Sequence, residues 1–171
     1  MTKEDAKYFV VWFNDPEVIK LLMWRDEREP LTLEYEEKWI EEMQTSETWK
    51  TFTIEALIGC MKIPVPIGNC SIHNIDKINQ RAGLGVNIGE TEFWEHGYGT
   101  EATKLLLGYA FQDLKLHRIE SLTLDDNGRA IGALIRSGYK QEGCRRGHIL
   151  RGGRFRDVLI FGILNHELKS K

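Results

Sequence analysis

The chain lacks several features that would place it in a specialised class. Its three cysteines are an odd number without a Cys-x-x-Cys pair, so we predict neither a disulfide framework nor a bound metal. Cys60 and Cys70 can meet across a hairpin, although buried free thiols are the more common arrangement. No apolar run approaches the roughly 18 residues that a membrane-spanning helix requires, and the opening Met-Thr-Lys-Glu-Asp is no signal peptide. We therefore expect a cytoplasmic, reduced protein with no membrane partner.

Charge of either sign is not in large excess. The formal net charge is -3, with acidic and basic residues interspersed, so we expect no nucleic-acid partner, which would call for a basic surface. The length of 171 residues suits one domain over residues 1–171 with a single core. No internal repeat or low-complexity tract is present, and we expect a monomer or a homodimer.

The most informative stretch begins with a glycine-rich strand. Leu84, Val86 and Ile88 alternate with glycines and Asn87, which predicts a strand with one apolar face and one nearly bare face. A bare face lets another chain or a ligand touch the backbone. A helix should follow, with its first turn at 97–100 and an apolar stripe at three- and four-residue steps. The predicted stripe consists of Ala102, Leu105, Leu106, Tyr109, Ala110 and Leu114.

Glycines at a helix start favour an anion site, because the first backbone N–H groups have no partner and the helix dipole is positive there. A Walker loop is excluded, since no Lys-Ser/Thr follows the glycines. Gly97-x-Gly99-x-x-Ala102, with Asp125 further on, fits a dinucleotide fingerprint. That motif is weak alone, and here residues 90–96 separate the strand from the first glycine. A nicotinamide-dependent oxidoreductase therefore stays the lesser alternative.

A family resemblance fits these letters better. The segment Phe-Trp-Glu-His-Gly-Tyr-Gly-Thr-Glu-Ala at 93–102 resembles motif A of the GCN5-related N-acetyltransferases, whose Arg/Gln-x-x-Gly-x-Gly/Ala loop binds the pyrophosphate of acetyl-coenzyme A. Trp94 stands at the Arg/Gln position, as in the branch that acetylates ribosomal-protein N-termini and small amines. The resemblance continues through Leu-His-Arg-Ile-Glu at 116–120, Asn-Gly-Arg-Ala-Ile at 127–131 and Asp-Val-Leu at 157–159. It covers about residues 5–167.

The resemblance implies an α/β fold with a mixed antiparallel and parallel twisted sheet flanked by helices. Two central parallel strands, ending at Ile88 and Leu124, should splay apart as a V. Patterning predicts helices over 2–13, 32–44 and 127–136 besides the central one, and the first should have Tyr8, Phe9, Val11 and Trp12 on its inner side. It predicts strands over 51–57, 67–75, 80–89, 117–124, 139–150 and 154–164. Relatives usually place a strand before the first helix, so we expect either that the sheet lacks this strand or that the chain starts further upstream.

The resemblance also assigns cofactor contacts. The strand residues Val86, Asn87 and Ile88 should meet the pantetheine arm and the acetyl carbonyl, with a backbone N–H near Ile88 stabilising the oxyanion. The backbone of His96, Gly97, Tyr98, Gly99 and Thr100 should hold the pyrophosphate. Asn127 should bond the pantetheine arm, cap the next helix, or do both. Arg129 can approach the nucleotide phosphates.

The acceptor side is less defined. Trp24, Arg25, Tyr35 and Trp39 are candidates for substrate contact by resemblance, although aromatic residues of helices more often belong to the core. Five arginines, at 145, 146, 151, 154 and 156, cluster on the last hairpin. They can meet an acidic partner or the 3'-phosphate of the cofactor, but charges at a solvated strand edge are more common.

The usual catalytic side chains are missing from their usual places. Gly83 stands where this branch often carries Glu, and Leu134 stands where many members have a general-acid Tyr, with Tyr139 at a usual Phe. His73, Glu90 or Glu92 can supply the base instead. His73 can equally be a strand-face histidine with satisfied nitrogens.

Two further explanations of the missing catalytic side chains require no general base from the protein. The acceptor can be an α-amine, whose pKa of about 7.7–8.0 leaves more neutral amine than a lysine near 10.4. Alternatively, the protein binds coenzyme A with little turnover, as a sensor or partner module. The leading prediction is acetyl transfer from acetyl-coenzyme A to a primary amine, either a peptide or protein N-terminus or a small amine such as a polyamine.

Overall fold

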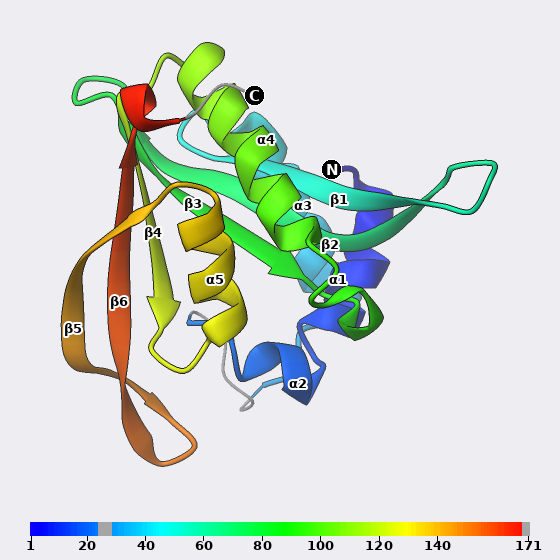
Figure 1. Cartoon of the computed structure of the whole chain (residues 1–171). Helices are drawn as coiled ribbons and strands as arrows, with labels where there is room; N and C mark the ends of the chain where they lie inside the picture. Colours follow the sequence, from blue (N-terminus) through cyan, green and yellow to red (C-terminus); the bar gives the residue numbers. More distant parts are fainter. Residues whose placement is uncertain (24–28, 169–171) are drawn as a thin grey trace.

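The computed structural model describes residues 1–23 and 29–168 (Figure 1). Trp24 and Arg25, two of the predicted substrate contacts, lie outside the described residues. The chain opens with helices, continues with three antiparallel strands, and then alternates helix and strand before a closing hairpin. None of the described helices combines the length and the apolar character needed to cross a membrane.

The N-terminal helices begin at residues suited to capping. A 3-10 turn, η1 (Lys3–Asp5), leads into α1 (Ala6–Trp12), and α2 (Pro16–Ile19) and α3 (Leu33–Thr45) follow. The Asp15 carboxylate accepts a hydrogen bond from Glu17 N at 2.8 Å, and Pro16 occupies the first helical position. Thr32 Oγ1 accepts from Tyr35 N at 3.3 Å, so the predicted start of the third helix is confirmed.

The sheet has six strands among the described residues, in the order β1-β2-β3-β4-β6-β5. They are β1 (Lys50–Ile58), β2 (Ile63–Asp76), β3 (Arg81–Ile88), β4 (Arg118–Leu124), β5 (Lys140–Arg151) and β6 (Arg154–Leu164). Among these six described strands, only the neighbours β3 and β4 are parallel, as the crossover through the central helix requires. The predicted mixed sheet is confirmed.

The two parallel strands separate soon after they pair. Their register holds only for Arg81 with Arg118, Ala82 with Ile119, and Gly83 with Glu120. β3 then runs on to Ile88 and β4 to Leu124 without pairing to each other, and Figure 1 shows the two arrows diverging. We call the unpaired region beyond Gly83 and Glu120 the splay. It is the V-shaped gap that the resemblance implies.

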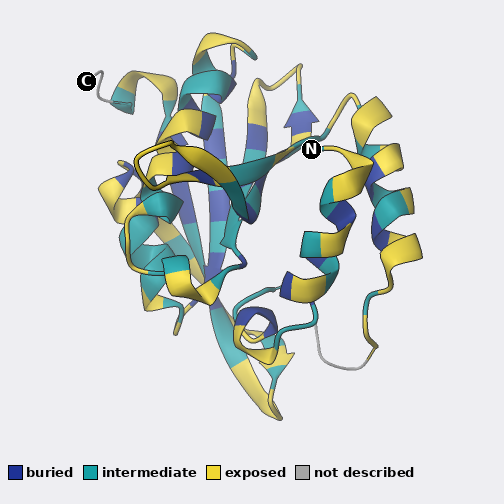
Figure 2. Cartoon of the chain, turned by 90° about the vertical axis from the view of Figure 1, so that its right-hand side faces the viewer, coloured by how far each residue is buried: buried dark blue, intermediate teal, exposed yellow. Residues whose placement is uncertain are grey.

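Helices cover both faces of the sheet. α4 (Tyr98–Gln112) and α5 (Gly128–Arg136) lie on one face, while α1 and α3 lie behind the other (Figure 1). One buried cluster joins α4 to β2, β3, β4 and β6, and a second joins α1 to Ile40 of α3. Figure 2 shows the buried residues on the middle strands and on the inward sides of the helices. The splay therefore opens between two helical layers.

Two predicted apolar positions are wrong. Leu105 is 70% exposed and Val11 is 64% exposed. In α4 the buried face is rotated to include Thr103 and Leu107. Thr103 can be buried because its Oγ1 donates to Gly99 O at 2.7 Å, so the hydroxyl keeps a hydrogen bond inside the protein. In α1 the inner face follows Ala6, Phe9 and Trp12, which places Val11 on the opposite side.

The β1–β2 hairpin also differs from the prediction. β2 begins at Ile63 rather than at 67, and Pro64 and Pro66 pair with β1. Prolines fit there because β3 reaches only to the level of Gly68, so the outer edge of this segment requires no N–H donors. Cys60, at the hairpin turn, is exposed rather than buried, and it does not meet Cys70. Cys70 lies in the core between β1 and β3, where burial raises its thiol pKa to about 12.

Candidate active site

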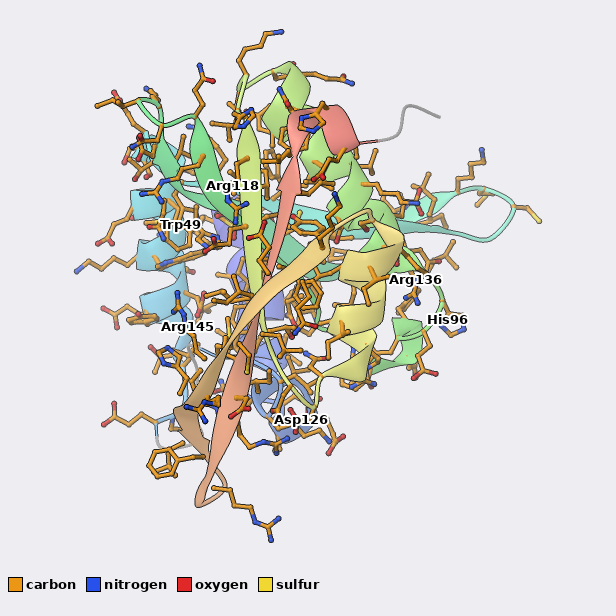
Figure 3. The ribbon with its side chains drawn as sticks, turned by 60° about the vertical axis from the view of Figure 1, so that its left-hand side comes forward. Trp49, His96, Arg118, Asp126, Arg136 and Arg145 are labelled. Atoms are coloured by element: carbon orange, nitrogen blue, oxygen red, sulfur yellow. The ribbon has the colours of Figure 1, made fainter. Side chains whose placement is uncertain are left out.

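Two cavities meet at the splay. The first, of about 910 Å³, is lined by the free part of β3, the start of α4, the end of β4 and α5. The second, of about 800 Å³, is lined by α3, by Trp49, and by the other end of the same strands. Both are lined by Asn69, Ser71, Leu84, Gly85 and Leu122. In Figure 3, Trp49 of the second cavity and Arg136 of the first lie on opposite sides of β4, the strand that carries Arg118.

The first cavity gathers nearly all of the residues predicted to bind the cofactor. Those lining it are Val86, Asn87, Ile88, Gly97, Tyr98, Gly99, Thr100, Asn127 and Arg129. His96 is exposed and does not line the cavity, because its Nδ1 lies 2.7 Å from Trp94 O and turns the ring back to the loop. These residues come from three separate segments, so the fold, rather than one motif, assembles the site.

The start of α4 presents open backbone donors. Gly97 is the N-cap residue with φ +91°, and no side chain of the described residues caps this helix end. A Cβ on Gly97 would meet no atom within 4 Å, so the space in front of the helix is open. The first N–H groups of a 15-residue helix therefore face the cavity, where an anion binds favourably.

Trp94 connects the loop to both strand and helix. Its Nε1 donates to Ile88 O at 2.7 Å, which fixes the loop to the last residue of β3. The Arg129 guanidinium lies 3.6 Å from the centre of the Trp94 ring, in a cation–π contact. At the position where the resembling family has Arg or Gln, this chain has an indole that holds an arginine beside the glycine loop.

Two further residues at this mouth contribute to the geometry. Asn127 Oδ1 accepts from Ala130 N at 3.1 Å, so the capping role is observed, and its position on the cavity leaves the cofactor role open to test. Arg136 Nε donates to Thr100 Oγ1 at 3.4 Å, which links the end of α5 to the start of α4. Sequence reasoning missed Arg136, because its place in the last turn of a predicted helix carries no signal for this contact.

A side-chain bridge spans the closed end of the splay. Ser121 Oγ, on β4, lies 2.8 Å from Leu84 O on β3 and 3.2 Å from the Tyr139 hydroxyl. A carbonyl only accepts, so the serine proton goes to Leu84 O and the tyrosine hydroxyl donates to Ser121. Burial raises the pKa of Tyr139 well above its usual value, so this phenol stays protonated. The bridge replaces strand pairing at the first position where β3 and β4 separate.

His73 lies in the second cavity. Its ring packs at a tilt against Trp49, with centroids 5.0 Å apart, and Nδ1 lies 3.5 Å from Ser71 Oγ. Burial lowers the pKa of His73 below its usual value. The face of β3 predicted to be bare is therefore covered at Gly83, where the imidazole lies directly against the glycine.

The other predicted base candidates lie elsewhere. The Glu90 carboxylate accepts a hydrogen bond from Trp12 Nε1 at 2.7 Å, and Glu90 lines neither cavity. Glu92 is exposed and lines neither cavity. Leu134, at the usual general-acid position, is buried and lines the first cavity with an apolar side chain. Among the predicted bases, His73 alone lines one of these two cavities.

The second cavity combines aromatic faces with charged groups, which are three carboxylates and two arginines. Tyr35 and Trp39, one turn apart on α3, both line it. Tyr35 is 57% exposed, so the alternative that it belongs to the core is wrong. Glu36, which lies between them in the sequence, is buried, although apolar periodicity does not predict a buried glutamate. Aromatic faces and carboxylates are the groups that attract an ammonium ion.

The hairpin arginines divide into two groups. Arg151 donates to the carbonyls of Leu22 and Met23 at 2.7 and 2.9 Å, and Arg156 forms ion pairs with Asp125 and Asp126. These arginines fix the hairpin to the rest of the protein. Those at 145, 146 and 154 are exposed at the edge of the sheet, which matches the expectation of solvated charge.

Comparison with known proteins agrees with this geometry. Residues 1–140 match the family model described as an acetyltransferase (GNAT) domain. An uncharacterized N-acetyltransferase, p20, of Bacillus licheniformis is 35% identical over 101 residues, which are 59% of this chain and 56% of that protein. The putative ribosomal N-acetyltransferase YdaF of Bacillus subtilis is 31% identical over 104 residues, which are 61% of this chain and 56% of that protein. The matched region thus spans little more than half the length of these relatives.

Solved structures share the fold at lower sequence identity. The spermidine N-acetyltransferase of Vibrio cholerae, determined in complex with CoA and spermine, superimposes with a TM-score of 0.85 at 20% identity, covering 98% of this chain and 94% of that one. A probable acetyltransferase superimposes with a TM-score of 0.82 at 23% identity, covering 98% and 91%. At sequence identities of 20% and 23%, the similarity to these structures shows a shared fold.

Proposed function

Because this chain belongs to the acetyltransferase (GNAT) family, we propose that it transfers an acetyl group from acetyl-coenzyme A to a primary amine. The observation that carries the proposal is the meeting of the two cavities at the splay. One cavity ends at an open helix start suited to a diphosphate, and the other offers aromatic and acidic groups suited to an amine. The thioester and the amine can then meet at Leu84 and Gly85.

The residues of the first cavity fit coenzyme A by their chemistry. The amides at Tyr98, Gly99 and Thr100 would hold the pyrophosphate, with Arg129 and Arg136 supplying positive charge nearby. Beyond Gly83 the backbone of β3 no longer pairs with the backbone of β4. Leu84 O accepts from Ser121 and Ile88 O accepts from Trp94, and the remaining β3 groups on this side would be available to the amides of the pantetheine arm. The bound cofactor supplies the activated acetyl group, while the protein positions it and excludes water.

Two classes of acceptor remain candidates. A small polyamine or another aliphatic amine would use the carboxylates and the Tyr35 and Trp39 rings of the second cavity. A peptide or protein N-terminus would present its α-amine through the same opening. The Vibrio cholerae enzyme was crystallised with spermine, which makes polyamines the first small amines to assay.

A thiol-release assay tests the proposal. The protein is incubated with acetyl-coenzyme A and a panel of polyamines, amino acids and peptides, while free thiol and the mass of each acceptor are followed. We expect thiol release that depends on one class of amine, with one acetyl group added to it. Coenzyme A binding without thiol release for any amine would instead indicate a sensor or partner module. No binding and no release would exclude both functions.

A further inference from the structure

A row of side chains crosses the sheet at the base of the splay, and a glycine interrupts it. His73 on β2 is opposite Gly83 on β3, and Gly83 is opposite Glu120 on β4. Residues directly opposite each other on neighbouring strands project from the same face of a sheet. His73 and Glu120 therefore share one face, with the space above Gly83 between them.

The imidazole occupies the space that a side chain at position 83 would need. A Cβ built on Gly83 would lie 2.3 Å from His73 Nε2 and 2.7 Å from Cδ2, far closer than real atoms approach. Position 83 is where the resembling sequences often carry a glutamate. The His73 ring can occupy this space only because position 83 is a glycine, so a glutamate at position 83 and the observed position of His73 exclude each other.

Contacts on three sides orient this ring. Trp49 packs against it at an interplanar angle of 31°, and Ser71 Oγ lies 3.5 Å from Nδ1 and can accept its proton. No described residue forms a hydrogen bond with Nε2. A Cβ on Gly85 would lie 3.9 Å from His73 Cε1, so the ring extends from Gly83 toward Gly85, one of the residues that line both cavities.

We propose that His73 is the general base of this reaction, with Nε2 accepting the proton of the acceptor amine in place of the glutamate that the resemblance implies at position 83. The inference rests on the proposed function. The amine nitrogen bonds to the thioester carbonyl carbon while the C–S bond breaks, and Nε2 takes one proton from that nitrogen. The thiolate then gains one proton from the imidazolium, directly or through water, so no proton is consumed overall.

Titratable and charged groups line the same cavity as the histidine, from α3 and from the strands β2, β3 and β4. They are Tyr35 and Glu36 on α3, Asp76 on β2, Arg81 on β3, and Arg118 and Glu120 on β4. The two arginines form ion pairs with Asp76 and Glu120, at 3.4 and 3.2 Å. Burial is the cause that lowers the pKa of His73, which keeps the imidazole neutral and able to accept a proton at neutral pH.

The first test compares His73→Gln with His166→Gln, which replaces an exposed histidine far along the chain. Calorimetry with coenzyme A first establishes that both variants are folded and bind the cofactor as the natural protein does. With an aliphatic amine whose pKa is near 10, we expect H73Q to lower kcat/KM by about 100-fold or more, since general base catalysis typically contributes that much. H166Q should leave kcat/KM unchanged.

The pH profile separates a base from a residue that only shapes the site. Below the pKa of His73, both the amine and the base must lose a proton, so log kcat/KM should rise with a slope of about 2 against pH. Above that pKa only the amine titrates, and the slope should fall to about 1. In H73Q the slope should be about 1 throughout. An altered cavity shape would lower the whole curve without changing its slope.

Position 83 supplies a second, independent pair of variants. Gly83→Ala should lose activity to a similar extent while keeping His73, because the new Cβ displaces the ring. The double variant H73A/G83E restores the carboxylate of the family in the space that the histidine vacates. We expect it to be about tenfold or more active than H73A alone, a modest share of what a positioned base contributes.

The outcomes distinguish the role of His73 as a base from the proposed acetyltransferase activity. A natural protein that acetylates no amine overturns the proposed function and the inference with it. An active natural protein whose H73Q variant keeps both its rate and the change of slope overturns the inference alone. Loss of rate in H73Q with the slope change retained would give His73 a structural role and also overturn it.

Discussion

Replacing Gly97 is the most direct perturbation of the cofactor loop. This residue caps α4 with φ +91°, a left-handed conformation that costs a residue with a side chain about 1–2 kcal/mol. The space around it is open, so Gly97→Ala meets strain but no clash. If the helix start keeps its geometry, the free energy of unfolding falls by that amount. If it relaxes instead, coenzyme A must restore the geometry on binding, and its Kd rises about 5- to 30-fold.

Gly97→Val sharpens this prediction, since a β-branched side chain is stiffer and occupies more of the space meant for the diphosphate. We expect its Kd for coenzyme A, measured by calorimetry, to rise by more than that of Gly97→Ala. Gly108→Ala is the matched control, because Gly108 lies within the same helix without a positive φ and with open space around its Cα. It should raise the free energy of unfolding by about 0.5–1 kcal/mol and leave the Kd unchanged. An unchanged Kd in Gly97→Val would mean that the diphosphate binds elsewhere.

Three further predictions concern single side chains. Asn127→Ala removes the cap on Ala130 N and should lower the free energy of unfolding by about 1 kcal/mol; urea titration showing no loss would contradict the capping role. Tyr139→Phe removes the bond to Ser121 and should cost about 1 kcal/mol by the same measurement, whereas equal stability would mean that the bridge contributes nothing. Burial lowers the pKa of His73 in the folded state, so the unfolded chain takes up the proton first as pH falls below about 6.5. The free energy of unfolding should therefore decrease more from pH 7 to pH 5 in the natural protein than in H73Q, and parallel decreases would refute this.

The strands and most helices could be predicted from the sequence because local patterns specify them. Alternation marks β3, Thr32 marks the start of α3, and the glycines at 97 and 99 mark the start of α4. The parallel pairing of β3 with β4 followed from the helix between them. Each of these features depends on residues close together in the chain.

Features that depend on distant segments were missed. One local feature was missed as well: Thr103 can be buried because Gly99 O, one turn earlier in α4, accepts its proton, so apolar periodicity alone placed Leu105 on the wrong face. The bridge from Ser121 to Leu84 and Tyr139 joins three strands or strand ends, and nothing local marks it. The sequence showed that position 83 lacks its usual glutamate, but the filling of that space by a ring from β2 depends on strand register.

The central claim is that cofactor and acceptor approach from two cavities and meet through the splay. Its most direct test is the affinity of a bisubstrate compound, in which the amine is joined through an acetyl bridge to the sulfur of coenzyme A. Such a compound fills both cavities at once only if they connect at Leu84 and Gly85. We predict that it binds at least about tenfold more tightly than coenzyme A, because the second group then binds without a further loss of translational freedom. A bisubstrate Kd equal to or weaker than that of coenzyme A would contradict the account.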